Sequence, residues 1–203
     1  MKRLFVAINL PTHIKEKLAQ AEKEINNAFN PEFLEAGVLK WVEPKNLHLT
    51  LLFLGAVADV QLENIKNVLQ KIAQQHSSFV LKTKRICYGP DQQHLARLIW
   101  LEVEKNPLLN ELSEQLKKEC YRAGVLHHSN QEQDRIFKAH ITLARLRSWV
   151  FSRMDPEERP SIDIPFLASI PVFSFELMES VLKRSGPQYT ALYSVALAKP
   201  KGH

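Results

Sequence analysis

The sequence predicts an α+β fold with mainly antiparallel strands, built from two related halves. Its apolar residues switch between strand-like and helical spacing in the order β-α-β-β-α-β-β-α-β-β-β. Each half also places a helix shortly before a strand that contains the triplet His-x-Thr. This arrangement indicates an internal duplication of β-α-β units.

The first half alternates predicted strands with amphipathic helices. The β-rich segment 3–9 is a strand, and Pro11 is a favoured first position for the helix after it. Segments 38–42 and 47–54 are strands joined by the turn-like EPKN, and Asp59 is expected to cap a second helix. The apolar faces of the two helices are Ile14, Leu18, Ala21 and Ile25, and Leu62, Ile65, Leu69 and Ile72.

The second half repeats the pattern. A third helix begins at Asn106-Pro107, carries Leu109, Leu112, Leu116 and Cys120 on one face, and stops at Gly124. The remaining expectations are strands at about 79–87, 95–103, 138–146, 171–181 and 189–198, a polar loop at 126–135, a surface loop or broken helix at 148–167, and a turn at Gly186-Pro187.

Composition describes an ordinary soluble protein. The 203 residues are 45% hydrophobic and 24% charged, and no apolar run reaches the 18 residues that suggest a membrane span. The apolar stretch near the N-terminus is too short for a signal peptide and lacks a cleavage site. Cys87 and Cys120 are isolated thiols, so we expect a reduced, cytoplasmic setting. The net charge of +5 is compatible with an anionic partner but does not establish one.

The repeated triplet is the most informative feature of the chain. It occurs in LHLTLLFLG (47–55) and in KAHITLARL (138–146). With 8 histidines and 5 threonines in 203 residues, random placement gives roughly 0.2 such triplets per chain. Two triplets, each with an apolar middle residue and a following leucine, therefore indicate a specific repeated use.

Strand geometry gives this repeat a chemical meaning. Residues i and i+2 of a strand share a face, so His48 and Thr50 point one way, and His140 and Thr142 do the same in the second motif. Two facing imidazoles, with ordinary pKa values near 6.5, suit paired general acid and base catalysis on a small anion. Threonine hydroxyls beside them can donate to phosphate oxygens.

Metal binding is the competing use of histidine. The motif histidines could join His127 or His128, but neither motif carries a carboxylate or cysteine at ligand spacing. His13, His76 and His94 fall in helix or loop contexts that are typical of surface residues.

The two motifs and their flanking residues resemble those of a known family. WVEPKNLHLTLLFLG and FKAHITLARLR are similar to the two His-x-Thr-x motifs of the two-histidine phosphoesterases, in particular the RNA 2′,3′-cyclic phosphodiesterases, also called 2′-5′ RNA ligases. The resemblance covers nearly the whole chain, including RLFVAINLP near the start and LMESVLKRSGPQYTALYSVAL near the end. It implies that residues 1–203 form a single domain of two pseudo-symmetric lobes. Two mainly antiparallel sheets would face a central cleft, with helices on the outside.

The resemblance also implies an activity. It makes the chain a metal-free and cofactor-free hydrolase of RNA 3′ ends that bear a 2′,3′-cyclic phosphate, such as tRNA fragments, and a monomer. His48 would protonate the departing 3′ oxygen to leave a 2′-phosphate, and His140 would accept the proton of water. Thr50 and Thr142 would hold phosphate oxygens. The reverse chemistry with an RNA 5′-hydroxyl would give 2′-5′ ligation.

Arg145 matches an arginine of the second family motif and is a predicted phosphate contact. Strict alternation turns it away from His140, and a bulge or strand end near Ala144 would turn it back. Many relatives carry a lysine or arginine at position 52, which alternation places on the His48 face; here it is Leu52, which removes one cation. The predicted base contacts are Phe53, Trp41 and Tyr189.

Two alternatives stay open. One is the same chemistry on another small phosphodiester, such as a 2′-5′ oligonucleotide or a nucleotide-derived cyclic phosphate. The other is a non-catalytic nucleotide- or RNA-binding module, although binding alone would not need two titrating groups. Because the basic residues are scattered and form no run of five or six, recognition is expected to centre on the RNA end.

Overall fold

The computed structural model describes residues 1–90, 96–126, 137–184 and 186–199. Its strands are β1 (Lys2–Asn9), β2 (Leu39–Trp41), β3 (His48–Val57), β4 (Phe79–Gly89), β5 (Leu98–Val103), β6 (His140–Leu146), β7 (Asp163–Pro165), β8 (Ser169–Val172), β9 (Ser174–Lys183) and β10 (Gly186–Ala196). Its helices are α1 (Thr12–Ala28), α2 (Pro31–Glu35), α3 (Leu62–Ala73), α4 (Pro107–Arg122) and α5 (Ser148–Phe151), with 3₁₀ turns η1 (Pro44–Asn46) and η2 (Asp59–Gln61). The predicted α+β class is confirmed.

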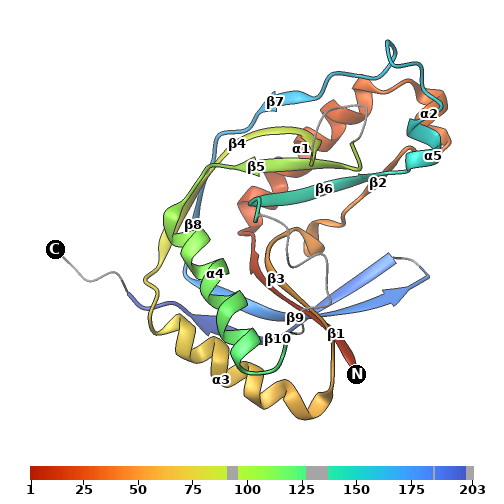
Figure 1. Cartoon of the computed structure of the whole chain (residues 1–203). Coiled ribbons are helices and arrows are strands. Elements are labelled where there is room, and N and C mark those ends of the chain that lie inside the picture. Colours follow the sequence, from red (N-terminus) through yellow and green to blue (C-terminus); the bar gives the residue numbers. More distant parts are fainter. Residues whose placement is uncertain (91–95, 127–136, 185, 200–203) are drawn as a thin grey trace.

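All paired strands among these residues run antiparallel, in the order β10-β9-β1-β3-β6-β5-β4-β7. The short strand β2 pairs with β6, and β8 pairs with β4. The path has two halves of four strands each, which meet where β3 joins β6. Figure 1 shows the half with β9 and β10 below and the half with β4 and β5 above.

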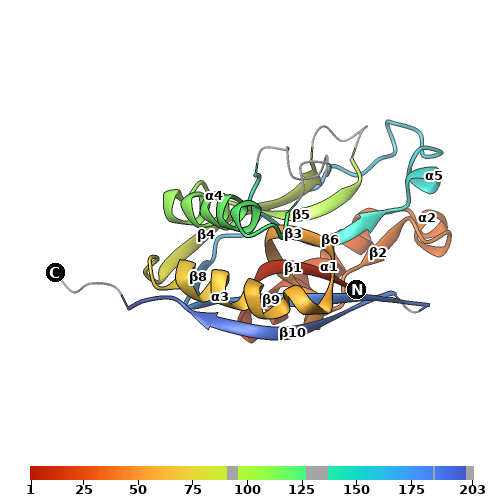
Figure 2. The ribbon, with the colours of Figure 1, turned by 60° about the horizontal axis from the view of Figure 1, so that its bottom comes forward.

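Helices cover the outward side of the sheet. Helix α3 packs against α4 and β10, and α4 packs against β3. Figure 2 shows α3 and α4 side by side along one flank of the strands. Ser113 of α4 donates a hydrogen bond of 3.0 Å to the backbone carbonyl of Leu51, which ties a helix of the second half to the motif strand of the first.

The main core lies between these helices and the sheet. It includes the apolar residues predicted for the three long helices, such as Ile14, Ile65 and Leu112, which are all almost fully buried. A second, smaller apolar cluster of Phe5, Ala7 and Met178, with Tyr189 packed against it, lies apart from this core. Strand β1 therefore buries side chains on both of its faces.

Several local predictions were wrong. Gly186 and Pro187 belong to β10, where they pair with Lys183 and Leu182, so they are strand residues and not the predicted turn. Asp59 lies inside η2 and makes no side-chain cap. His76 is buried, 6% exposed, and its Nε2 is hydrogen-bonded to Gln115.

Segment 148–167 contains α5 and the short strand β7, and segment 171–181 is divided between β8 and β9. The polar loop 126–135 lies outside the described residues apart from Leu126, as do His94, His127 and His128.

Candidate active site

The two His-x-Thr motifs meet at the junction of the two half-sheets. Leu49 of β3 pairs with Ile141 of β6, and these are the middle residues of the two motifs. Both are fully buried on the core side. The histidines and threonines next to them in sequence are half-buried on the opposite face. One antiparallel residue pair thus brings all four polar side chains of the motifs to one face of the sheet.

Matching β-bulges follow both motifs. In β3 the register to β1 shifts between Leu52 and Thr50, and in β6 the register to β5 shifts between Ala144 and Thr142. Because each bulge adds one residue, the residue after it changes face. The exposure patterns of the first seven residues of β3 and β6 are identical, with an exposed residue at Phe53 and at Arg145.

The bulges decide where two of the predicted residues lie. Arg145 is turned to the face of the histidines, as the bulge near Ala144 would require. The expectation that Leu52 lies on the His48 face was wrong, because Leu52 is 7% exposed and packs in the main core. Phe53, 47% exposed, occupies in the first half the place that Arg145 has in the second.

His48 is held on several sides. Its Nδ1 lies 2.6 Å from the backbone carbonyl of Asn46, so Nδ1 carries the proton and donates it. In the neutral ring, Nε2 then accepts from the Thr50 hydroxyl at 3.0 Å. The rings of Phe5 and Tyr189 pack against the imidazole, with centroids 5.0 and 5.3 Å away.

His140 is held in the same way. Its Nδ1 donates to the backbone carbonyl of Lys138 at 2.7 Å, again two residues before the histidine. The indole of Trp100 lies against the imidazole, with ring centroids 4.5 Å apart and planes at 41°, much as Phe5 lies against His48. Among the described residues, Nε2 of His140 has no hydrogen-bond partner, which leaves it free for a ligand.

Gly89 makes room for the indole. A Cβ on Gly89 would lie 2.3, 2.4 and 2.6 Å from three ring atoms of Trp100, closer than real Cβ contacts come. Trp100 is 8% exposed and pairs with Thr142 on the neighbouring strand, on the face of the histidines. Gly89 therefore fixes the place of a ring that in turn contacts His140.

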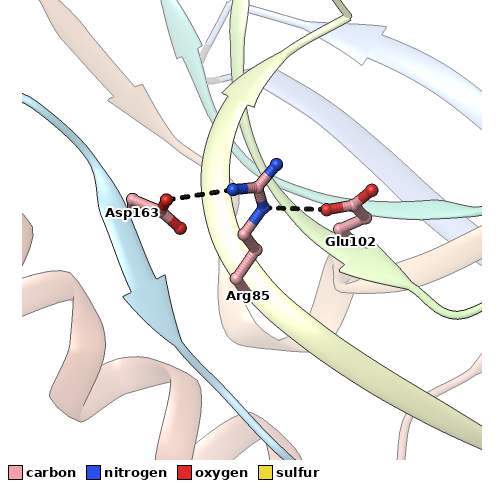
Figure 3. A network of polar contacts seen from close by, with 3 residues as sticks. All are labelled: Arg85, Glu102 and Asp163. Carbon is pink, nitrogen blue, oxygen red and sulfur yellow. Dashed lines mark hydrogen bonds and ion pairs between the residues drawn. The ribbon is translucent and has the colours of Figure 1, made fainter.

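Each histidine also faces a polar residue on the next strand. Asn9 pairs with His48, and its side-chain amide donates to Glu176 of β9 at 3.2 Å. Glu102 pairs with His140 and accepts a bond of 3.0 Å from the guanidinium of Arg85. Figure 3 shows Arg85 between two carboxylates, with its Nη1 2.9 Å from Asp163.

Burial and nearby charge act on the two imidazoles. Loss of hydration lowers the pKa of His48, although its bond to the Asn46 carbonyl acts in the opposite direction. The positive charges of His140, Lys15 and Arg145 lower the pKa of His48 further. The pKa of His140 is also lowered by burial, opposed by its bond to the Lys138 carbonyl. Both rings are therefore biased toward the neutral state until an anion enters.

The three predicted base contacts have different places. Phe53 and Tyr189 lie on the face of the histidines, and both contact Phe5. Trp41 is not brought to this face. It pairs with the buried Ala144, and its indole N–H donates to Asn26 of α1 at 3.0 Å.

A metal site is not assembled by the described residues. No three His, Cys, Asp or Glu side chains of the described ranges lie close enough together to hold an ion. Cys87 and Cys120 are both free thiols. No helix in the part of the chain that the structure describes is long and apolar enough to cross a membrane.

Sequence reasoning missed Phe5, Trp100 and Gly89, as well as the backbone carbonyls of Asn46 and Lys138. The aromatic residues carry no signal of their own, because strand aromatics are ordinary core residues. Asn46 and Lys138 each stand two residues before a motif histidine, which the sequence shows. The direction in which a backbone carbonyl points depends on the path of the folded chain, which the sequence does not show.

Comparison with known proteins gives one consistent result. Residues 8–100 match the family model described as LigT like Phosphoesterase. A curated RNA 2′,3′-cyclic phosphodiesterase of Archaeoglobus fulgidus is 32% identical over 197 residues, covering 94% of this chain and 97% of that protein. The proteins of the same name from Escherichia coli and Bacillus subtilis are 30% and 29% identical, covering 98% and 96% of this chain and the same shares of their own.

Solved structures agree with these relatives. The chain is similar to the protein TT0787 of Thermus thermophilus, with a TM-score of 0.78 and 28% identity over 98% of this chain and 99% of that one. It is also similar to E. coli LigT crystallised with 3′-AMP, with a TM-score of 0.72 and 28% identity over 98% of both chains.

Proposed function

The chain belongs to the LigT-like phosphoesterases, the family of the RNA 2′,3′-cyclic phosphodiesterases, and we propose that it opens terminal RNA 2′,3′-cyclic phosphates by acid–base catalysis between His48 and His140. One observation carries the proposal: the Leu49–Ile141 pair joins both motifs and leaves four polar side chains on one face. The family makes the chain a phosphodiesterase. The non-catalytic alternative has no observation in its favour.

The reaction needs one proton acceptor and one proton donor on opposite sides of the phosphate. His140, through its free Nε2, takes a proton from water as the water oxygen bonds to phosphorus. The bond from phosphorus to the 3′ oxygen breaks, and His48 gives its Nε2 proton to that oxygen. The product is a 2′-phosphomonoester with a free 3′-hydroxyl. If an RNA 5′-hydroxyl replaces water, the same attack forms a 2′-5′ phosphodiester.

The surroundings of the histidines fit these roles once substrate is bound. Each Nδ1–H is fixed on a carbonyl, so each Nε2 is the atom that exchanges protons. The anionic phosphate raises the pKa of His48, offsetting burial and the cations that lower it in the free protein. Thr50, Thr142 and Arg145 supply donors for the non-bridging oxygens.

Biological context belongs to the same proposal. We expect one domain that acts as a monomer in the cytoplasm, on RNA 3′ ends such as tRNA fragments. It needs no metal or cofactor, because the two histidines supply both proton transfers.

The test combines variants with product analysis. His48→Ala and His140→Ala should each lower kcat by about 10²- to 10⁴-fold on a dinucleotide with a 2′,3′-cyclic phosphate, and the double variant should be little worse. His13→Ala, an exposed histidine in the first turn of α1, is the matched control and should keep full activity. Activity lost to EDTA and restored by zinc would overturn the metal-free mechanism.

Phosphorus NMR of the product tests the assignment of roles. A 2′-phosphate is expected, because His48 is assigned to the 3′ oxygen. A 3′-phosphate would mean that the roles of the two histidines, or the orientation of the substrate, are reversed.

A further inference from the structure

Basic residues from three segments gather at the C-terminal end of β6. They are Lys40 of β2, Arg145 at the end of β6, and Arg147 and Arg153 on either side of α5, and all four are exposed. Figure 1 shows β2, α5 and the end of β6 side by side. Within the described ranges, none of the four forms an ion pair with a carboxylate. Their positive charge is therefore available to an anionic partner.

The cations are continuous with the candidate active site. The bulge in β6 turns Arg145 to the face of the histidines, and Lys40 pairs with Arg145 across the strands, so it lies on that face too. The Lys40 ammonium lies 4.0 Å from where a Cβ on Gly186 would stand, at the start of β10. The two side chains thus extend the active face beyond His48.

An aromatic ring lies among the same charges. Trp149 of α5 is 54% exposed, and the guanidinium carbons of Arg147 and Arg153 lie 5.8 and 5.3 Å from its ring. Arg147 also donates to the backbone carbonyl of Ala36, which holds it in place. An exposed indole among arginines provides the stacking and charge that bind single-stranded RNA without sequence preference.

The opposite end of the active face carries two carboxylates. Glu102 pairs with His140, and Asp163 lies beyond it, so two carboxylates surround the single guanidinium of Arg85 in Figure 3. Arg85, Glu102 and Asp163 together carry a net charge of −1, whereas the Arg145 end carries four cations that are unpaired among the described residues, so the Arg145 end is the stronger attractor of a phosphate chain. This segregation of charge favours one direction for a bound strand.

We infer that Lys40, Arg145, Arg147, Arg153 and Trp149 form a binding surface for the RNA strand that leads to the cyclic end. The inference rests on the proposed function and extends it from the terminal phosphate to several nucleotides before it. Its occupant is single-stranded RNA, since a duplex would leave no base free to stack on Trp149.

The salt dependence of turnover gives the first measurement. Recognition of the end alone predicts a slope of roughly −1 to −2 in log kcat/KM against log salt, at about −0.7 per phosphate contacted. Contacts of Lys40, Arg147 and Arg153 with three further phosphates predict roughly −3 to −4 for a 12-mer. A dinucleotide should keep the shallow slope.

Variants test the surface itself. Trp149→Ala should weaken 12-mer binding, followed by fluorescence anisotropy, about 10-fold or more, and Arg153→Gln should make the salt slope shallower by about 0.7. Phe173→Ala, an aromatic 66% exposed elsewhere, and Lys118→Gln, an exposed lysine of α4, are the controls and should change neither quantity. Turnover of the dinucleotide should stay the same in all four variants.

The outcomes separate the two proposals. Equal 12-mer binding by the wild type, Trp149→Ala and Arg153→Gln would overturn the surface, whatever the dinucleotide shows. Absence of dinucleotide turnover by the wild type would overturn the proposed function, while anisotropy would still report on the surface.

Discussion

Replacing Gly89 with alanine should displace the Trp100 ring and, through it, the imidazole of His140. The new Cβ of Gly89→Ala would stand 2.3–2.6 Å from three atoms of the Trp100 ring, whereas ordinary contacts begin at 3.4 Å. The indole must therefore move by about 1 Å, or the strand must move away from it. Because the indole already lies 4.5 Å from the ring of His140, that movement is passed on to the imidazole.

Two magnitudes follow from this geometry. Overpacking a buried site costs about 1–3 kcal/mol of unfolding free energy, which a shift of the urea midpoint measures. A displacement of about 1 Å at a proton-transfer group costs up to about 10²-fold in kcat. We expect kcat to fall by about 10- to 100-fold on a dinucleotide cyclic phosphate, with a smaller change in KM.

A double-mutant cycle isolates the cause. Trp100→Leu removes the ring that the methyl group meets, so Gly89→Ala should destabilise the Trp100→Leu protein much less than the wild type. If Gly89→Ala keeps wild-type kcat and an unchanged urea midpoint, the chain of contacts from Gly89 to His140 does not position the imidazole.

Two further predictions concern charge. Arg145→Gln should lower kcat/KM for a dinucleotide cyclic phosphate by about 10- to 100-fold, the usual worth of a hydrogen bond to a charged group, while Lys118→Gln changes nothing; wild-type kcat/KM in the Arg145 variant would mean that the bulge does not bring the guanidinium to the phosphate. The second concerns stability. The pKa values of His48 and His140 are lowered in the folded protein, so at a pH just below about 6.5, the ordinary histidine pKa, the unfolded chain binds more protons than the folded one. The contribution of the two neutral histidines to the unfolding free energy is therefore fully present above about pH 6.5 and is lost as the pH falls below that value. In urea titrations, His140→Gln should lose less unfolding free energy than the wild type between about pH 7 and pH 5. An equal loss in that variant would contradict the burial of His140 as its cause.

Much of the fold was predictable because the apolar periodicity of long elements survives in the sequence. Helices α1 and α4 begin at their expected starts and α4 ends just before Gly124, because Pro11, Asn106 and Gly124 carry strong local signals. Short elements such as α2, α5 and β7 have too few residues to show a period. The Gly186-Pro187 turn was wrong because a glycine-proline pair also fits the first positions of an edge strand.

Some features of the candidate site could also be predicted from the sequence, and others could not. The faces of the four motif residues follow from alternation alone. The faces of Leu52 and Arg145 do not, because a bulge is a property of the pairing between strands and has no mark in either strand. The gathering of Lys40, Arg147 and Arg153 could not be predicted either, since the residues are scattered along the chain and only the fold brings them together.

The pairing of Leu49 with Ile141 has a consequence for how the protein can vary. The distance between the two motifs is fixed by main-chain hydrogen bonding, and the side chains at these positions only need to be apolar. Substitutions that leave this pair and the contacts of the two imidazoles intact can therefore accumulate without moving the motifs apart. Residues that do not touch either imidazole, such as Lys40, are then free to diverge, and a change of preferred RNA can arise without rebuilding the chemistry.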